Sequence, residues 1–186
     1  MTAQIPDVLL LQERTLSIVG VNGMGLFDPY AINLQPVSHI TSCWRGYVCT
    51  YKTLYNKLLL DALQINLNHA GLAINDVWPV LSRESTFDNT YGDLNLPVDF
   101  TGGILAASDF IQQLYIHMGF HPAWKYKIVF ELILSQGYVI ETRDVSERMQ
   151  EIRNEMIKSP LEPGVNATKG QIEEWVASTF KLDYNF

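Results

Sequence analysis

Residues 42–51 (SCWRGYVCTY) and residues 57–67 (KLLLDALQINL) decide the fold of this chain. Both runs are rich in aromatic, β-branched and leucine side chains, which suit a pleated strand. Asn56 lies between them with neighbours suited to a tight turn, so the two runs predict one long β-hairpin. No known reactive motif accompanies this hairpin, and the sequence therefore indicates an architecture more clearly than an activity.

Further strands are expected on both sides of the hairpin. Residues 8–12 and 16–21 flank a short polar stretch and predict a first hairpin. Residues 98–107 and 113–118 predict two more strands with a corner at 108–109. The intervening residues 68–96 contain proline, glycine and many polar side chains, which indicates an extended surface loop.

The apolar run 128–134 fits either a strand or a helix, because a short run cannot be assigned by periodicity alone. The Ser-Gln-Gly stretch at 135–137 resembles a turn, which favours a hairpin between this run and residues 138–141. A helix over residues 123–134 remains the alternative.

The sequence beyond residue 144 has helical periodicity. The apolar positions of a first helix are Val145, Met149, Ile152 and Met156. Asp144 or Ser146 is its expected N-cap. Thr168 and Gln171 form a capping-box pattern that begins a second helix. The apolar positions of that second helix are Ile172, Val176 and Phe180.

These elements predict an α+β fold: a mainly antiparallel, twisted sheet of consecutive hairpins with two C-terminal helices packed on one face. A chain of 186 residues suits one domain, with a sheet core at about 8–142 and a helical part at about 144–186. The net charge of −7 disfavours nucleic acid and anionic membranes as partners, and suits a basic protein. We expect a cytoplasmic protein, because neither a signal peptide nor an apolar run long enough to span a membrane is present.

The two cysteines, Cys43 and Cys49, are expected on one face of a strand with Arg45, Tyr47 and Tyr51. Six residues of extended strand separate two Cα atoms by roughly 20 Å, which excludes a disulfide between them. Reduced, partly buried thiols are therefore expected. An arginine on one strand face with two tyrosines suits a bound carboxylate or phosphate, and the alternative is an ion pair at the sheet surface.

His117 and His121 are four residues apart, as in helical zinc motifs, but Gly119 and Pro122 disfavour the helical turn and the glutamate is missing. We expect their rings to bind backbone groups and predict no metal and no cofactor. The candidate ligand-binding residues are Arg45, Tyr47, Asp99, His117 and His121.

The Trp-Arg-Gly-Tyr-Val segment at 44–48, the leucine-rich strand after it, and the segment 115–120 with its His-Met-Gly turn resemble a group of bacterial proteins without established activity. The resemblance spans about residues 43–141. It implies a bacterial, intracellular protein in which the arginine strand and the His-Met-Gly turn belong to one sheet. It implies no catalytic residues.

The leading functional hypothesis is a non-enzymatic interaction module that binds a protein partner, such as an immunity-type neutraliser of a basic partner. It depends on the acidic charge, the missing catalytic motifs and an acidic loop near the aromatic sheet. Its candidate contact residues are Asp88, Tyr91 and Asp93. The alternatives are a small-ligand or hydrolytic site near Arg45, Asp99 and His117, and a subunit of a homo-oligomer.

Overall fold

The computed structural model describes residues 2–24, 26–82, 84–157 and 167–179, together with residues 182 and 184. The strands within these residues are β1 (Val8–Leu11), β2 (Arg14–Gly23), β3 (Tyr47–Leu54), β4 (Lys57–Ile65), β5 (Val80–Leu81), β6 (Asn89–Tyr91), β7 (Leu96–Pro97), β8 (Gly102–Phe110), β9 (Tyr126–Ser135) and β10 (Tyr138–Asp144). The helices are α1 (Ser146–Met156) and α2 (Lys169–Thr179), with 3-10 turns at Pro29–Ile32, Gln112–Leu114 and Ala123–Lys125.

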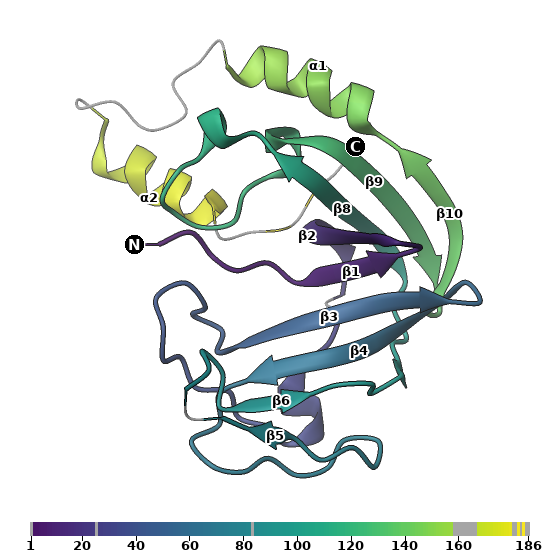
Figure 1. Ribbon diagram of the computed structural model, residues 1–186. Helices are drawn as coiled ribbons and strands as arrows, with labels where there is room; N and C mark the ends of the chain where they lie inside the picture. Colours follow the sequence, from purple (N-terminus) through teal and green to yellow (C-terminus); the bar gives the residue numbers. More distant parts are fainter. Residues whose placement is uncertain are drawn as a thin grey trace.

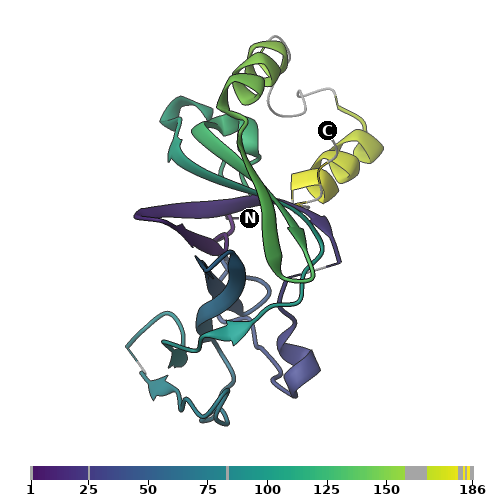
Figure 2. The ribbon, with the colours of Figure 1, turned by 90° about the vertical axis from the view of Figure 1, so that its right-hand side faces the viewer.

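The ten strands form one sheet in the order β10-β9-β8-β2-β1-β3-β4-β6-β5, with β7 beside β4. The β1–β3 pair is parallel and the other pairs are antiparallel. The predicted α+β class is thus confirmed. The helices lie at one end of the molecule and β5 and β6 at the other (Figures 1 and 2). No helix among the described residues is long and apolar enough to cross a membrane.

The predicted central hairpin is confirmed as β3 and β4. Its turn consists of Tyr55 and Asn56, whose φ angles of 50° and 59° match the twist that a two-residue hairpin needs. The sheet curves so strongly that its first strand in the order, β10, meets β4 beside this turn. There Tyr138 pairs with Lys57, and the Val139 amide donates to the Asn56 carbonyl at 2.7 Å.

The curved sheet encloses the main apolar core. Its fully buried side chains include Leu9, Leu16, Ile18, Tyr51, Leu58, Leu60, Leu63, Ile65, Tyr91 and Phe100. Alternation places the strand residues among them on the inner face, because successive side chains of a strand point to opposite faces, and Phe100 joins them from the segment before β8.

The other hairpin predictions have mixed outcomes. The first hairpin is confirmed as β1 and β2, and the run 128–134 is a strand, within β9, that pairs with β10. The loop 68–96 contains three short strands, β5, β6 and the start of β7. The strand predicted at 98–107 begins only at Gly102 and continues past the expected corner to Phe110.

The strand predicted at 113–118 is wrong. The segment begins in a 3-10 turn, where the Leu114 and Tyr115 amides donate to carbonyls three residues earlier, and the Met118 amide donates to the Ile116 carbonyl. Both edges of the preceding strand β8 are already paired, with β2 and β9. The segment therefore satisfies its backbone groups locally in turns.

Helix α1 packs on the outer face of β9 through buried Met149 and half-buried Ile152. The N-cap is Val145, and not Asp144 or Ser146 as predicted. The Asp144 carboxylate nevertheless accepts a bond from the Ser146 amide at 2.9 Å. The Ser146 hydroxyl oxygen accepts a bond from the Val129 amide at 3.0 Å, which ties the start of the helix to β9. The predicted packing of this helix is confirmed, except that Met156 is exposed.

Helix α2 begins with the predicted capping box: the Thr168 amide donates to Gln171 Oε1 at 2.9 Å, and the Gln171 amide donates to Thr168 Oγ1 at 3.3 Å. The predicted burial of Ile172 is wrong, because 43% of this residue is exposed. Val176 is half-buried, and Phe180 lies outside the described residues.

Candidate functional site

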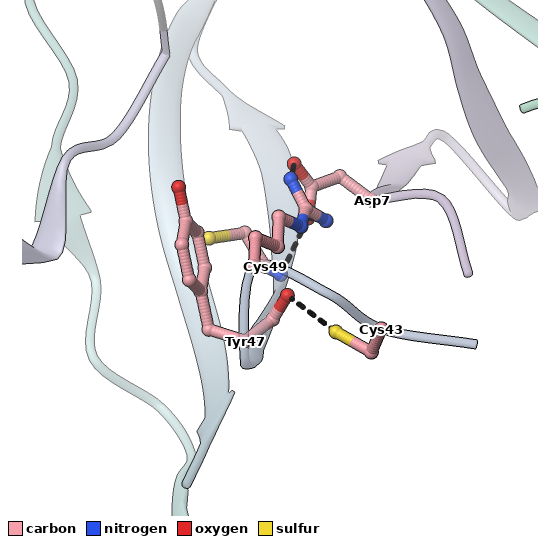
Figure 3. A network of polar contacts seen from close by, with 5 residues as sticks. Asp7, Cys43, Tyr47 and Cys49 are labelled. Atoms are coloured by element: carbon pink, nitrogen blue, oxygen red, sulfur yellow. Dashed lines mark hydrogen bonds and ion pairs between the residues drawn. The ribbon is translucent and has the colours of Figure 1, made fainter. Parts of the chain in front are cut away.

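The most conspicuous polar network joins the segment before β1 to the start of β3 (Figure 3). The buried Asp7 carboxylate accepts two bonds from the Arg45 guanidinium, at 2.9 and 2.5 Å, and one from the Cys49 amide at 2.6 Å. Arg45 lies in the turn that precedes β3, not on the strand as predicted. Its guanidinium stacks over the Tyr47 ring at 4.8 Å. The charged end of this arginine is thus engaged within the chain.

The protonation of this network follows from its burial. Burial raises the pKa of Tyr47 to about 12, in spite of the nearby Arg45 charge. Burial alone would lower the pKa of Arg45, but the Asp7 carboxylate outweighs it and the pKa is raised. The network therefore combines a charged arginine, its carboxylate partner and a neutral phenol, which is the arrangement of an internal ion pair.

Both cysteines are buried free thiols next to this network. Burial is the main cause that raises the pKa of Cys49 and of Cys43 above the ordinary thiol value. Cys43 lies outside the strand, so the expectation of one shared strand face is wrong, and its thiol donates to the Tyr47 carbonyl at 3.2 Å. A thiol that stays protonated is a poor nucleophile, so this arrangement suits packing better than covalent catalysis.

Gln4 joins the Trp-Arg-Gly-Tyr-Val segment at 44–48 to the His-Met-Gly turn within 115–120. Its amide donates to the Gly119 carbonyl at 2.7 Å, and its side-chain Oε1 accepts a bond from the Trp44 amide at 3.0 Å. The arginine strand and the His-Met-Gly turn were expected to belong to one sheet, but Trp44 lies in a turn before β3 and Gly119 makes only an isolated bridge to Ala3, outside the named strands. The two turns are nevertheless neighbours, because the segment before β1 runs between them.

The two candidate histidines have different surroundings. His117 is exposed, with its Nδ1 at 2.9 Å from the Tyr115 hydroxyl. The His121 ring packs against Phe110 and Tyr115, with centroids 4.7 and 5.1 Å apart, and both of its nitrogens are buried without a hydrogen-bond partner among the described residues. The expected bonds from these rings to backbone are thus not found in the described part of the chain. Burial, assisted by the Lys125 charge, lowers the pKa of His121 to about 4.

The alternative site near Arg45, Asp99 and His117 is not assembled. Asp99 is exposed beside Gly137, at the turn between β9 and β10. That turn adjoins the far end of the β3–β4 hairpin, so β3 separates Asp99 from Arg45 by roughly 20 Å. Among the described residues, no three His, Cys, Asp or Glu side chains are grouped so as to hold a metal ion.

Two of the three candidate contact residues hold the loop 68–96 in place. The Asp88 carboxylate accepts bonds from the Leu67 and Asn68 amides, at 3.0 and 2.9 Å, and from the Asn89 side chain at 2.6 Å. Partial burial would raise the pKa of Asp88, but these hydrogen bonds outweigh it and lower the pKa. Tyr91 is fully buried, so its side chain is not available to a partner, whereas Asp93 is exposed.

Four large apolar side chains at and near β5, in the same loop as these residues, are exposed, and sequence analysis missed them. We call this part of the molecule the edge surface, and its side chains are Leu72, Trp78, Val80 and Leu81, which are 70%, 70%, 71% and 57% exposed. It includes β5, the last strand of the sheet order, whose outer edge has no strand partner among the described residues. The sequence signal is the group of large apolar residues inside a stretch otherwise typical of a loop.

A pocket of about 400 Å³ opens next to the edge surface. It is lined by Asn68, His69, Ala70, Leu81, Ser82, Asp88 and Asn89. Leu81 belongs to both features, and Asp88 brings a carboxylate to the pocket. A concave site with a few apolar and several polar lining groups suits the anchor side chain of a protein partner.

Comparison with known proteins finds no counterpart: no family model, no curated protein and no solved structure matches this chain. The geometry of the described residues therefore supports two statements about sites. The network around Asp7 is an ion pair formed within the chain, and the edge surface presents apolar side chains to solvent.

Proposed function

We propose that this chain is a non-enzymatic module that binds a basic protein partner through the edge surface. The observation that carries the proposal is the exposure of Leu72, Trp78, Val80 and Leu81 by more than half within ten residues of chain. Leaving such side chains in water costs free energy that a partner would recover by covering them. Tryptophan is also among the residues that contribute most to binding at protein interfaces.

The charge around the edge surface favours a basic partner. Residues 66–95 contain four acidic residues and one basic residue. Three of these acidic side chains are exposed, and none of them forms an ion pair with a described residue: Asp76, Glu84 and Asp93. Complementary charge at the rim of an apolar contact raises the association rate and selects the partner. Neutralisation of a basic partner, as immunity proteins perform it, is the form of binding that this charge suits.

The anchoring of the loop also supports a binding role. The Tyr91 hydroxyl donates to the Leu72 carbonyl at 2.8 Å, and the Asn89 side chain accepts a bond from the Gly71 amide at 2.8 Å. These buried side chains hold the backbone beneath the exposed apolar ones. A surface fixed in advance loses little conformational entropy when a partner binds.

The test is affinity capture from the host at moderate and high salt, with wild type and surface variants. We expect a basic protein in stoichiometric amount, released at high salt and lost with the double variant Trp78→Ser, Val80→Ser. Tyr55→Ser is the matched control, because Tyr55 is aromatic and almost fully exposed, but lies at the β3–β4 turn. Circular dichroism establishes that each variant is folded. Capture that is the same for wild type and the folded double variant would refute the proposal.

A further inference from the structure

A second feature, independent of the edge surface, lies on the outer face of the sheet. Strands β2, β8 and β9 are neighbours in the sheet (Figure 1). Their register places Gly20 of β2 opposite Leu105 of β8, and Leu105 opposite Glu131 of β9. Tyr184, which is distant in sequence, packs against this face in the same apolar cluster as Met149 of α1. We call the site formed by Gly20, Gly103 and Glu131 the glycine slot.

The two glycines make room for the Tyr184 ring. A Cβ atom on Gly20 would lie 2.9 Å from Tyr184 Cδ1, and a Cβ atom on Gly103 would overlap the Tyr184 hydroxyl. Neither glycine has a positive φ angle, so their backbone conformations do not require glycine. Their role in this structure is therefore to leave space for a ring.

The far end of the slot is polar. The Tyr184 hydroxyl donates to Glu131 Oε1 at 3.0 Å, and Arg143 Nη1 lies 3.6 Å from Glu131 Oε2. Glu131 is buried, and the arginine keeps a countercharge beside it whether or not a phenol is bound. The slot thus combines space for a ring with an acceptor for its hydroxyl, which together recognise tyrosine and disfavour phenylalanine.

The backbone of the bound segment is also recognised. The Val21 amide donates to the Leu182 carbonyl at 2.7 Å, at a point where β2 has continued past its partner β1. A main-chain bond to a strand edge combined with a side-chain pocket is how sheets bind extended peptides.

We infer that the glycine slot is a binding site for an extended, tyrosine-bearing peptide, and that the chain fills it here with its own Leu182 and Tyr184. The first half of α2 packs little against the rest of the molecule, since its side chains at 169–174 are exposed, whereas Trp175 and Val176 are half-buried. Local detachment of a weakly packed segment costs much less than global unfolding. A peptide supplied by another molecule then competes for the slot with the chain's own segment that carries Leu182 and Tyr184. That segment has a high effective concentration because it is tethered to the same molecule.

The test uses a fluorescent peptide that reproduces residues 180–186 (FKLDYNF) and measures its binding to full-length chains by anisotropy. We expect Tyr184→Ala to bind it at least about tenfold more tightly than wild type, because the internal competitor is removed. Tyr184→Phe, which keeps the ring but loses the bond to Glu131, should be intermediate. The same peptide with alanine in place of its tyrosine should not bind.

Gly103→Ala, added to Tyr184→Ala, fills the slot and should abolish binding. Its other nearby atom, Asn22 Cβ, would be at an ordinary contact distance of 3.8 Å, so the fold should tolerate the change. Gly92→Ala in the same background is the matched control, because no atom lies within 4 Å of the place its methyl group would take, and binding should persist. No binding to folded Tyr184→Ala, equal binding to Tyr184→Phe and wild type, or binding that survives Gly103→Ala would each overturn the inference.

Discussion

The network around Asp7 and the edge surface adjoin the same end of the β3–β4 hairpin, on opposite sides of it. In the network, a carboxylate and a guanidinium are withdrawn from water and bound to each other. At the edge surface, apolar side chains face water and the acidic residues near them have no ion-pair partner among the described residues. The difference teaches that the charged group of a conspicuous motif, here Trp-Arg-Gly-Tyr-Val, can be paired within the chain while apolar side chains of an inconspicuous loop stay exposed.

The largest expected effect comes from breaking the network. Asp7→Ala leaves Arg45 partly buried without its countercharge and removes the acceptor of the Cys49 amide. Loss of one partner of a buried ion pair costs about 3 kcal/mol or more. Urea unfolding should show this loss, whereas Asp99→Ala, at an exposed position, should unfold like wild type. Equal stability of the two variants would mean that the network does not hold the fold together.

The next effect is a pH dependence near the same end of the hairpin. The folded chain protonates His121 near pH 4, below the ordinary value of 6.5, so the unfolded state binds more protons between these values. The free energy of unfolding should therefore fall as pH falls, by about 1–2 kcal/mol between about pH 7 and about pH 5. His121→Phe should flatten this dependence, because a phenylalanine keeps the ring contacts and does not titrate. An unchanged slope in the variant would assign the effect to other groups.

A smaller effect is expected beneath the edge surface. Tyr91→Phe keeps the buried ring but removes the hydroxyl that donates to the Leu72 carbonyl. The loss of one such hydrogen bond costs about 1 kcal/mol in unfolding free energy. Tyr138→Phe is the control, since Tyr138 is exposed and should tolerate the change. Equal stability of wild type and Tyr91→Phe would show that the loop does not depend on this bond.

The smallest effect on stability is expected at the edge surface itself. Trp78→Ser should change the unfolding free energy by less than about 0.5 kcal/mol, because the side chain is mostly in water. The same variant should nevertheless weaken partner capture. Asp7→Ala, in the network, should not weaken capture under conditions in which it remains folded. A large loss of stability in urea unfolding would instead assign Trp78 to the core.

The local parts of the fold were predictable because each depends on a short sequence pattern. Alternating apolar residues predicted β3 and β4, and Thr168 with Gln171 predicted the start of α2. The strand at 113–118 failed because the pairing edges of β8 were already occupied, which no short pattern reveals. The candidate site residues failed to meet because Arg45 and Asp99 lie near opposite ends of the β3–β4 hairpin, which the sequence pattern does not reveal either.

By itself the sequence determined the hairpins, helix α1 and the capping box of α2, because turn residues and periodicity act between near neighbours. The tertiary structure alone decided which distant groups meet: Asp7 with Arg45, Gln4 with Gly119, and Tyr184 with Glu131. These contacts follow from strand order and sheet curvature, which bring together residues whose separation along the chain carries no periodic signal. Tertiary structure also decided that Trp78 stays in water while Tyr91 is buried, although both aromatic side chains come from the same loop.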